Sequence, residues 1–207
     1  MKTLQIGVTG GMGSGKSLVS KIFHCLGAPV YDADSRAKNV MTTDGILISQ
    51  IRKEFGVLSY HSDGTLNREF IGKKVFSNPS RLKVLNELVH PRVAEDYKKW
   101  IHEHLHFAYV IKEAALLFEA GSYRSLDWII LVSAPEELRI KRVIRRDAGR
   151  TVEQVKDILL QQWSEEKKAE LANGIIKNDE SELVIPQVVN LHNLFEMGRL
   201  PSSSIQR

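Results

Sequence analysis

The fold is decided by the stretch Leu4-Gln5-Ile6-Gly7-Val8-Thr9-Gly10-Gly11-Met12-Gly13-Ser14-Gly15-Lys16-Ser17. Residues 4–9 are typical of a short buried strand, and residues 10–17 fit the pattern G-x-x-x-x-G-K-[S/T] of a phosphate-binding loop. Apolar residues then recur at helical spacing from Leu18 to Leu26. Strand, glycine-rich loop and helix therefore follow one another in the order that this motif requires.

The residue types in the loop explain why it is expected to hold phosphate. Glycines let the backbone curl so that its N–H groups point inward, which makes an anion-binding concavity at the positive end of the following helix. Lys16 can reach the β- and γ-phosphates of a nucleotide, and the Ser17 hydroxyl can join the coordination sphere of Mg²⁺. A glycine-rich turn without a ligand is the alternative, and the two correct flanks count against it.

Strand-like and helical segments alternate along the chain. The apolar strand-like segments are residues 4–9, 29–31, 107–111, 128–132 and, more weakly, 174–176. This alternation predicts an α/β fold with a parallel sheet, helices on both faces and ligand-binding residues at the carboxyl ends of the strands. Between the second and third strands, apolar positions over about 35–106 recur at helical spacing, which predicts an inserted helical lobe. We expect one domain over residues 1–198 and a frayed tail over 199–207.

Length and composition limit the remaining possibilities. A chain of 207 residues, 43% of them hydrophobic, can bury one core with a small appended lobe. No apolar stretch approaches the roughly 20 residues that span a bilayer, and the start of the chain does not resemble a secretion signal, so we expect a cytoplasmic protein without a membrane partner. The single cysteine, Cys25, lies on the apolar phase of the first helix, and we expect it to pack in the core.

The charged residues are mixed along the chain, with 29 basic and 25 acidic side chains and a net charge of +4. A small anionic ligand explains this balance as well as a nucleic acid does. The sharpest basic cluster is Arg139, Lys141, Arg142, Arg145, Arg146 and Arg150. A solvated helix face is the ordinary interpretation of such a run, but beside a phosphate loop it favours a clamp on polyphosphate. Because no aromatic residues interleave the cluster, we expect no nucleic-acid partner.

Two carboxylates, Asp32 and Asp34, follow the second strand, at the sheet edge where the phosphate loop also opens. In phosphoryl transfer, an aspartate near the acceptor oxygen orients that oxygen and takes its proton. An N-cap for a helix beginning near Ser35, or a metal ligand, are the rival interpretations. We favour Asp34 as the base and Asp32 in the environment of Mg²⁺. Glu113, at the end of the third strand, is a secondary candidate for holding Mg²⁺ through water.

Over nearly its whole length, the chain resembles the dephospho-coenzyme A kinase family. The matching motifs are Gly7 to Ser17, Asp32-Ala33-Asp34, Leu66-Asn67-Arg68, His90-Pro91, Leu116-Leu117-Phe118-Glu119 and Ile176-Lys177-Asn178. The resemblance implies a three-layer P-loop NTPase fold with an inserted helical substrate lobe and an arginine lid. It also implies that ATP, with Mg²⁺, phosphorylates the ribose 3′-hydroxyl of dephospho-coenzyme A, which gives coenzyme A and ADP in the last step of coenzyme A synthesis. Ala114-Ala115 and Asn173 depart from the common family pattern.

The resemblance also implies roles for individual residues. Asp34 would be the general base, with Lys16 and Arg142 assisting transfer. ATP would contact Gly11, Met12, Gly13, Ser14, Gly15, Lys16, Ser17, Arg142, Arg146 and Asn178, the last of these near the base. The lid would cover about 139–151. The acceptor would contact Asp32, Asp34, Arg68 and His90, and Ser17 and Asp32 would hold the metal ion. For His90, orienting a turn before Pro91 remains an equally open alternative.

Two other classes of protein remain in view. Another small-molecule kinase of the same architecture could act on a nucleoside monophosphate, shikimate or a sugar acid, but Asp32-Ala33-Asp34, His90-Pro91 and the size of the lobe suit a bulky acceptor. A GTP-dependent switch would usually carry an Asn-Lys-x-Asp motif, which the sequence lacks.

Zinc at His102, His104 and His106 is disfavoured, because on a helix only the first and last share a face. We expect a monomer or a weak homo-oligomer.

Overall fold

The computed structural model describes residues 2–75 and 78–201, and the chain divides into two compact units. The first unit joins Met1–Asp32 to Glu103–Arg207, and the second is Ala33–His102. Most of the expected tail at 199–207 lies outside the described residues. Within 2–75 and 78–201, no helix combines the length and the apolar character needed to cross a membrane.

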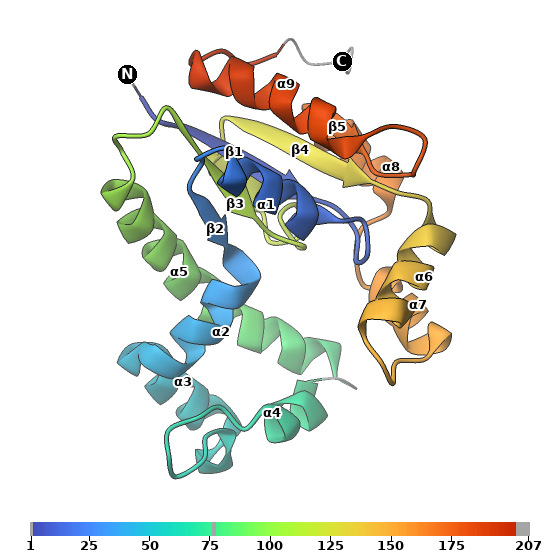
Figure 1. The fold of residues 1–207 in the computed structure, drawn as a ribbon. Helices are drawn as coiled ribbons and strands as arrows, with labels where there is room; N and C mark the ends of the chain where they lie inside the picture. Colours follow the sequence, from blue (N-terminus) through green and yellow to red (C-terminus); the bar gives the residue numbers. More distant parts are fainter. Residues whose placement is uncertain (1, 76–77, 202–207) are drawn as a thin grey trace. The chain divides into compact units, whose positions relative to one another are not determined.

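The first unit contains every strand of the sheet (Figure 1). Its elements are β1 (Leu4–Thr9), α1 (Lys16–Cys25), β2 (Val30–Asp32), β3 (Tyr109–Glu113), η2 (Ser122–Ser125), β4 (Trp128–Ser133), α6 (Glu136–Arg146), α7 (Val152–Leu160), α8 (Glu165–Leu171), β5 (Gly174–Lys177) and α9 (Val184–Glu196). Each strand begins and ends within two residues of the segment predicted from the sequence.

The five strands are all parallel and stand in the order β2-β3-β1-β4-β5. The central strand is β1, in which Ile6 lies opposite both Ile111 and Trp128. The predicted parallel α/β sheet is therefore confirmed. Because all carboxyl ends lie at one edge, the loop that follows β1 opens where ligands bind in sheets of this kind.

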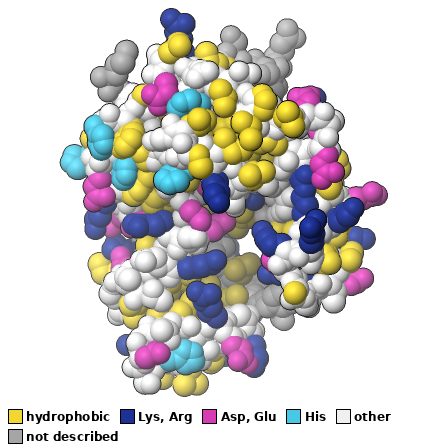
Figure 2. Space-filling model, in the orientation of Figure 1, with side chains coloured by type: hydrophobic (Ala, Val, Ile, Leu, Met, Phe, Trp, Pro, Cys, Tyr) yellow, Lys and Arg dark blue, Asp and Glu magenta, His cyan; other side chains and the backbone are white. Residues whose placement is uncertain are grey.

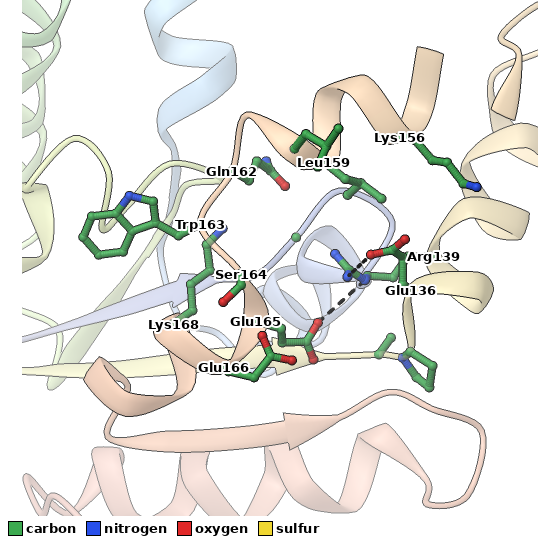
Figure 3. A pocket seen from close by; sticks show the side chains of 14 residues that line it. Glu136, Arg139, Lys156, Leu159, Gln162, Trp163, Ser164, Glu165, Glu166 and Lys168 are labelled. Carbon is green, nitrogen blue, oxygen red and sulfur yellow. Dashed lines mark ion pairs between the residues drawn. The ribbon is translucent and has the colours of Figure 1, made fainter. Parts of the chain in front are cut away.

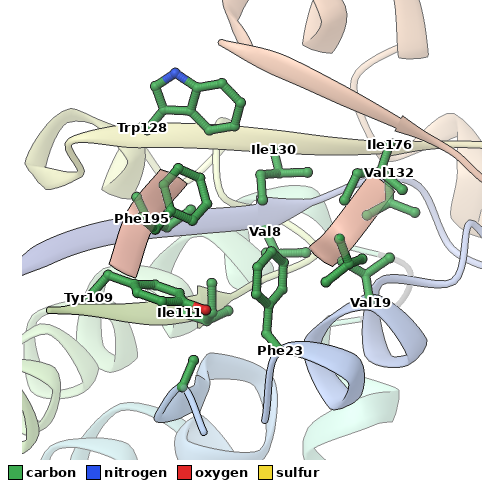
Figure 4. Close-up of a cluster of buried hydrophobic side chains, with 13 residues drawn as sticks. Val8, Val19, Phe23, Tyr109, Ile111, Trp128, Ile130, Val132, Ile176 and Phe195 are labelled. Atoms are coloured by element: carbon green, nitrogen blue, oxygen red, sulfur yellow. The ribbon is translucent and has the colours of Figure 1, made fainter. Parts of the chain in front are cut away.

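Helices α1 and α9 cover one face of the sheet. Ile6 and Val8 point into a core that includes Phe23 of α1 and Phe195 of α9 (Figure 4). Gly7 faces the other way, because side chains alternate along a strand. There, the side chains of Leu117 and Leu126 lie so close that a Cβ on Gly7 would come within 2.9 Å of both. Both faces of β1 are thus covered from Ile6 to Thr9, as expected for a central strand of a parallel sheet.

Helix α1 differs in detail from the expectation. It begins at Lys16, two residues before the apolar pattern, and Gly15 is its N-cap. Its buried side chains are Val19, Ser20 and Phe23. Cys25 is exposed, so the expectation that it packs in the core is wrong. The reason is geometric: two residues turn a helix by about 200°, which directs Cys25 away from the face that carries Phe23.

The departure at Asn173, just before β5, is accommodated by the strand beside it. The backbone N–H of Ile129 donates to the Asn173 side-chain oxygen at 2.9 Å, and the backbone N–H of Asn173 donates to the Ile129 carbonyl at 2.9 Å. An amide oxygen accepts this hydrogen bond without a charge. Substitution of the common family aspartate by Asn173 therefore keeps an acceptor where the strand pair needs one.

The second unit is helical. It contains α2 (Ala33–Thr43), α3 (Gly45–Phe55), η1 (Val57–Ser59), α4 (Arg68–Val75) and α5 (Pro79–Glu103, whose last residue belongs to the first unit). Its own core gathers Val40, Leu47, Ile51, Phe55, Tyr60, Ile71 and Val89. Asp44 caps α3 through the Leu47 N–H at 2.9 Å and also pairs with Arg92 of α5, while Arg36 of α2 pairs with Asp96. These ion pairs connect α2 and α3 to the long helix α5.

Candidate active site

The loop between β1 and α1 curls tightly on itself. The Ser14 N–H donates to the Gly11 carbonyl at 3.1 Å, and the Leu18 N–H donates to the Gly15 carbonyl at 3.0 Å. Gly13 and Gly15 have φ values of +80° and +98°, in the left-handed region that favours glycine. The backbone that the phosphate-loop pattern predicts is therefore present, and its amides lie at the positive end of α1.

Lys16 directly follows the loop, and its side chain extends back over the loop. It is the first residue of α1, and its Nζ donates a hydrogen bond to the Gly11 carbonyl oxygen at 3.2 Å. A cation held across the loop faces the space where the amides converge. Lys16 is thus placed to meet an anionic group that enters the loop.

A cleft of about 250 Å³ opens beside the loop. Its lining consists of Gly13, Gly15, Lys16, Ser17, Leu18, Arg142, Val143 and Arg146. Arg142 and Arg146 are one helical turn apart on α6. They line one side of the cleft, and the loop and Lys16 line the other. Lys and Arg side chains also gather over α6 and α7 on the molecular surface (dark blue in Figure 2). The cleft combines backbone amides with three cations, which suits a polyphosphate.

Arg142 and Arg146 differ in their hydrogen-bond and ion-pair partners. The Arg142 guanidinium donates to the Asn178 carbonyl at 2.9 Å and lies 3.4 Å from the Glu180 carboxylate. Arg146 is more exposed and pairs with Asp147 at 2.7 Å, and this pair lowers the pKa of the Asp147 carboxyl. Arg142 is therefore fixed against the segment after β5, whereas Arg146 pairs with the residue that follows it in the chain.

A hydroxyl and two carboxylates meet at the ends of β2 and β3. Ser17 donates from Oγ to the Glu113 carboxylate at 2.8 Å, and Asp32 lies opposite Glu113 in the sheet. Burial raises the pKa of the Glu113 carboxyl above its usual value, the hydrogen bond from Ser17 offsets part of this rise, and the negative charge of Asp32 adds to it. Hydroxyl and carboxylate oxygens are the ligands that Mg²⁺ takes beside phosphate oxygens. Ser17, Asp32 and Glu113 therefore fit a magnesium ion bound together with a nucleotide.

Histidine, cysteine and acidic side chains do not otherwise suggest a metal centre. Over the part of the chain that the structure describes, no three such side chains are arranged to hold a metal ion. Helix α5 ends at Glu103, so of the three alternating histidines only His102 is helical. His104 instead stacks on His106 and on Phe107, and the His106 ring packs on Phe107 in a tilted arrangement.

Asn178, just after β5, lies against the rear of the loop. Its side-chain amide donates to the Ser14 carbonyl at 2.7 Å, and its backbone N–H donates to the Ser133 carbonyl at 2.8 Å. A Cβ on Gly15 would overlap with this amide, which is a second reason for glycine at that position. The contact with a nucleotide base that the sequence resemblance implies for Asn178 stays a prediction.

Comparison with known proteins decides the family. A sequence model described as dephospho-CoA kinase matches residues 4–183. The chain belongs to the dephospho-CoA kinase family. A dephospho-CoA kinase from Bacteroides fragilis strain YCH46 is 37% identical over 191 residues, which cover 91% of each chain. Two solved structures are also similar across nearly the whole chain.

Those structures support the same assignment at the level of the fold. A dephospho-CoA kinase from Campylobacter jejuni is 27% identical, with a TM-score of 0.67, and the match covers 94% of this chain and 98% of that one. The Thermus thermophilus protein TT1252 is 32% identical, with a TM-score of 0.80, and the match covers 92% of this chain and 96% of that one. The resemblance inferred from the motifs is thereby confirmed.

Three of the residues expected to contact the acceptor in this family member belong to the helical unit. Asp34 lies in the first turn of α2, which begins at Ala33 and thus two residues before the expected start near Ser35, so Asp32 and not Asp34 directly precedes the helix. Arg68 is exposed and begins α4. His90 lies within α5, and Pro91 is also inside that helix. The alternative that His90 orients a turn is therefore wrong.

Two contacts on the loop were not predicted from the sequence. The Met12 N–H donates to the Gln162 side-chain oxygen at 3.0 Å, and Arg139 packs beneath Gly11. Gln162 is held in place because Glu119 of the Leu116–Glu119 motif accepts from the Trp163 N–H at 2.9 Å and pairs with the buried Lys168 at 3.0 Å. No local sequence pattern predicts a contact between residues 150 positions apart. The contact between Met12 and Gln162 therefore could not be predicted without the fold.

Proposed function

We propose that the protein transfers the γ-phosphate of ATP to the 3′-hydroxyl of the ribose of dephospho-coenzyme A, giving coenzyme A and ADP. The observation that supports it most is the phosphate loop with its cationic cleft in a chain that belongs to the dephospho-CoA kinase family. A phosphoryl-transfer enzyme mainly positions its reactants and stabilises charge. The residues of the cleft supply both.

The loop would bind the triphosphate through its backbone. Gly13, Gly15, Lys16 and Ser17 line the cleft, where their backbone amides would bind phosphate oxygens, and Lys16 would add a cation that reaches the β- and γ-phosphates. Arg142 and Arg146 would neutralise the charge that develops on the transferred group, an effect worth several kcal/mol in a site without water. Asn178 would contribute by holding the loop and Arg142, in addition to the expected contact near the base.

Magnesium would bind where Ser17, Asp32 and Glu113 meet, and when bound it neutralises phosphate charge. The protein's own part is to hold these oxygens in place. Ser17 is tied to Glu113 by a hydrogen bond of 2.8 Å, and sheet pairing aligns Asp32 with Glu113. Glu113, a secondary candidate from the sequence, is therefore part of the proposed metal environment together with the primary candidates Ser17 and Asp32.

Asp34 would act as the general base. As the acceptor hydroxyl oxygen forms its bond to the γ-phosphorus, the bond between that phosphorus and the β–γ bridging oxygen of ADP breaks. The proton of the hydroxyl passes to the Asp34 carboxylate. Arg68 and His90, in the helical unit, would bind the anionic and hydroxyl groups of the acceptor. The expected cytoplasmic location and monomeric or weakly oligomeric state remain part of this proposal.

The experiment that tests the proposal measures ADP release from ATP and Mg²⁺ with dephospho-coenzyme A as the acceptor. Parallel reactions contain AMP, shikimate, gluconate or no acceptor. We expect release only with dephospho-coenzyme A, and coenzyme A formed in equal amount. Stimulation by another acceptor would move the substrate within the same kinase architecture, and slow hydrolysis without any acceptor would favour a nucleotide-dependent switch. Either result would overturn the assignment.

A further inference from the structure

Arg139 differs from the other two arginines on its face of α6. Residues 139, 142 and 146 share a face because they are three and four positions apart. Their side chains become more exposed along the helix, from 11% for Arg139 to 27% for Arg142 and 63% for Arg146. Arg142 and Arg146 line the cleft beside Lys16, whereas Arg139 lines a different cleft of about 560 Å³ (Figure 3). Arg139 therefore lies where the helix meets the loop.

Two glycines of the phosphate loop pack directly on Arg139. A Cβ on Gly11 would overlap with the guanidinium nitrogen Nη1, and a Cβ on Gly13 would overlap with the Arg139 carbonyl oxygen. Gly13 already needs to be glycine because of its positive φ, but Gly11 has no such φ. The general loop pattern also allows any residue at position 11. Close packing against Arg139 is thus the feature that explains glycine there.

The charge of Arg139 is already compensated within the protein. Its Nε lies 3.6 Å from the Glu165 carboxylate, and its Nη2 lies 4.0 Å from Glu136 (dashed lines in Figure 3). Glu165 in turn accepts a hydrogen bond from the Ser133 hydroxyl at the end of β4. These are ion pairs without a hydrogen bond, and the buried guanidinium is positioned by its charge between the two carboxylates and by its packing on Gly11. This arrangement suits support of the loop rather than a clamp on phosphate.

We propose that Arg139 is a positioning residue that fixes the loop backbone at Gly11 against α6. Because Arg142 and Arg146 lie on the same helix, the contact sets the distance between the loop amides and the two arginines. Loop and helix then present a single preformed surface to the triphosphate, and less binding energy is spent on ordering them. This inference rests on the proposed binding of ATP at the loop.

A double-mutant cycle tests the contact, with the variants Gly11→Ala, Arg139→Ala and the two combined. The dissociation constant of Mg-ATP is measured by calorimetry, and the melting temperature is measured without nucleotide. The methyl group of Gly11→Ala pushes against the guanidinium, so this variant should bind ATP more weakly. Removal of the guanidinium makes room for the methyl group. The combined variant should therefore bind ATP about tenfold more tightly than the product of the two single losses predicts.

Matched controls separate positioning from general destabilisation. Glu137→Ala changes an exposed charged residue of the same helix, outside the expected lid, and should leave ATP binding unchanged. Arg139→Lys keeps a charge but loses the planar fork, and it should weaken ATP binding at nearly unchanged melting temperature. If Gly11→Ala does not fold, Arg139→Lys still decides the question. A residue that only stabilises the fold would lower the melting temperature without changing ATP affinity of the folded protein.

The outcomes can be told apart from failure of the proposed function. Strictly multiplicative losses in the cycle, or a fully active Gly11→Ala, would overturn the role of Arg139. Calorimetry with ATP needs no acceptor, so the role of Arg139 can stand even if dephospho-coenzyme A is not the substrate. If the unmodified protein binds no ATP, the proposed function fails first, while coupling between the two variants in melting temperature still tests the contact itself.

Discussion

The side-chain amide of Asn178 donates a hydrogen bond of 2.7 Å to the backbone carbonyl of Ser14, although 164 positions separate the two residues. The Asn178 carbonyl accepts from Arg142 at 2.9 Å. One asparagine at the end of β5 therefore connects the phosphate loop to the arginine helix. The bonded amide is buried, so its loss leaves the Ser14 carbonyl without this partner.

Asn178→Ala should lower the free energy of unfolding by about 1–3 kcal/mol, because it leaves a buried backbone carbonyl unsatisfied. It should also raise the KM for ATP, since Ser14 belongs to the loop. Chemical denaturation and steady-state kinetics measure the two effects. Asn190→Ala, at an exposed position of α9, is the matched control and should change neither quantity. Unchanged unfolding and unchanged KM in Asn178→Ala would contradict the prediction.

Lys16→Ala should reduce the turnover number by about a hundredfold or more, because it removes the cation nearest the transferred phosphate. The fold should survive, since Lys16 is the first residue of α1 and its side chain lines the cleft rather than the core. Circular dichroism and ADP release measure the two properties. Lys21→Ala removes an exposed lysine of the same helix and should behave as the unmodified protein. Normal turnover of Lys16→Ala would rule out the loop as the site of transfer.

Asp34→Asn should lower the turnover number by about 10²–10⁴-fold and change the KM for ATP little, because a general base acts on the acceptor and not on nucleotide binding. Asp32→Asn is the informative comparison. We expect it to raise the Mg²⁺ concentration required for half-maximal activity. If Asp34→Asn turns over as fast as the unmodified protein, Asp34 is not the general base. The base would then be Asp32, or the reaction would use none.

Glu113→Gln should make the protein more stable at neutral pH and less active. Burial raises the pKa of Glu113 in the folded state, so the folded protein binds its proton more tightly than the unfolded chain does. The contribution of this group to stability is therefore greatest at low pH and falls as pH rises through the raised pKa. Glutamine carries no charge at any pH and avoids that loss.

Melting temperatures measured from about pH 4 to about pH 8 check the sign, because the advantage of Glu113→Gln should grow with rising pH. Activity measured against Mg²⁺ concentration checks the second half of the prediction, since an amide is a weaker ligand than a carboxylate. A stability difference that does not depend on pH would show that Glu113 stays ionised at low cost. Unchanged magnesium dependence would exclude it from the metal environment.

The sheet and the loop could be predicted because their signals are local. Strands that are buried in a parallel sheet appear in the sequence as short, mostly apolar runs. The glycines at 13 and 15 are needed for a positive φ, and the short loop pattern includes a glycine-rich turn of this kind. Contacts that depend on the fold could not be predicted in the same way. Gln162 and Arg139 reach the loop from other helices, and nothing in their own neighbourhoods indicates a glycine as the partner.

Errors in the prediction also have physical reasons. The apolar character of its helix predicts that Cys25 is buried. The side chain is exposed, because Cys25, the last residue of α1, does not lie on the face that carries Phe23. The motif His90-Pro91 suggested a turn, because proline usually disfavours helix for the residue before it. Helix α5 continues through Pro91 for twelve more residues, so the tertiary structure overrides that local preference. Local rules therefore fail where a long helix packs in its own unit.

The exposed thiol at Cys25 offers a ready attachment point for a spectroscopic reporter. It is the single cysteine of the chain, and it ends the helix that Lys16 begins. The attachment point lies about 13.5 Å along the helix axis from the lysine, given a rise of about 1.5 Å per residue. One added cysteine on the surface of the helical unit would complete a donor–acceptor pair. Energy transfer between the two dyes would then report, in real time and without altering the loop, whether the distance between the dyes changes when nucleotide binds.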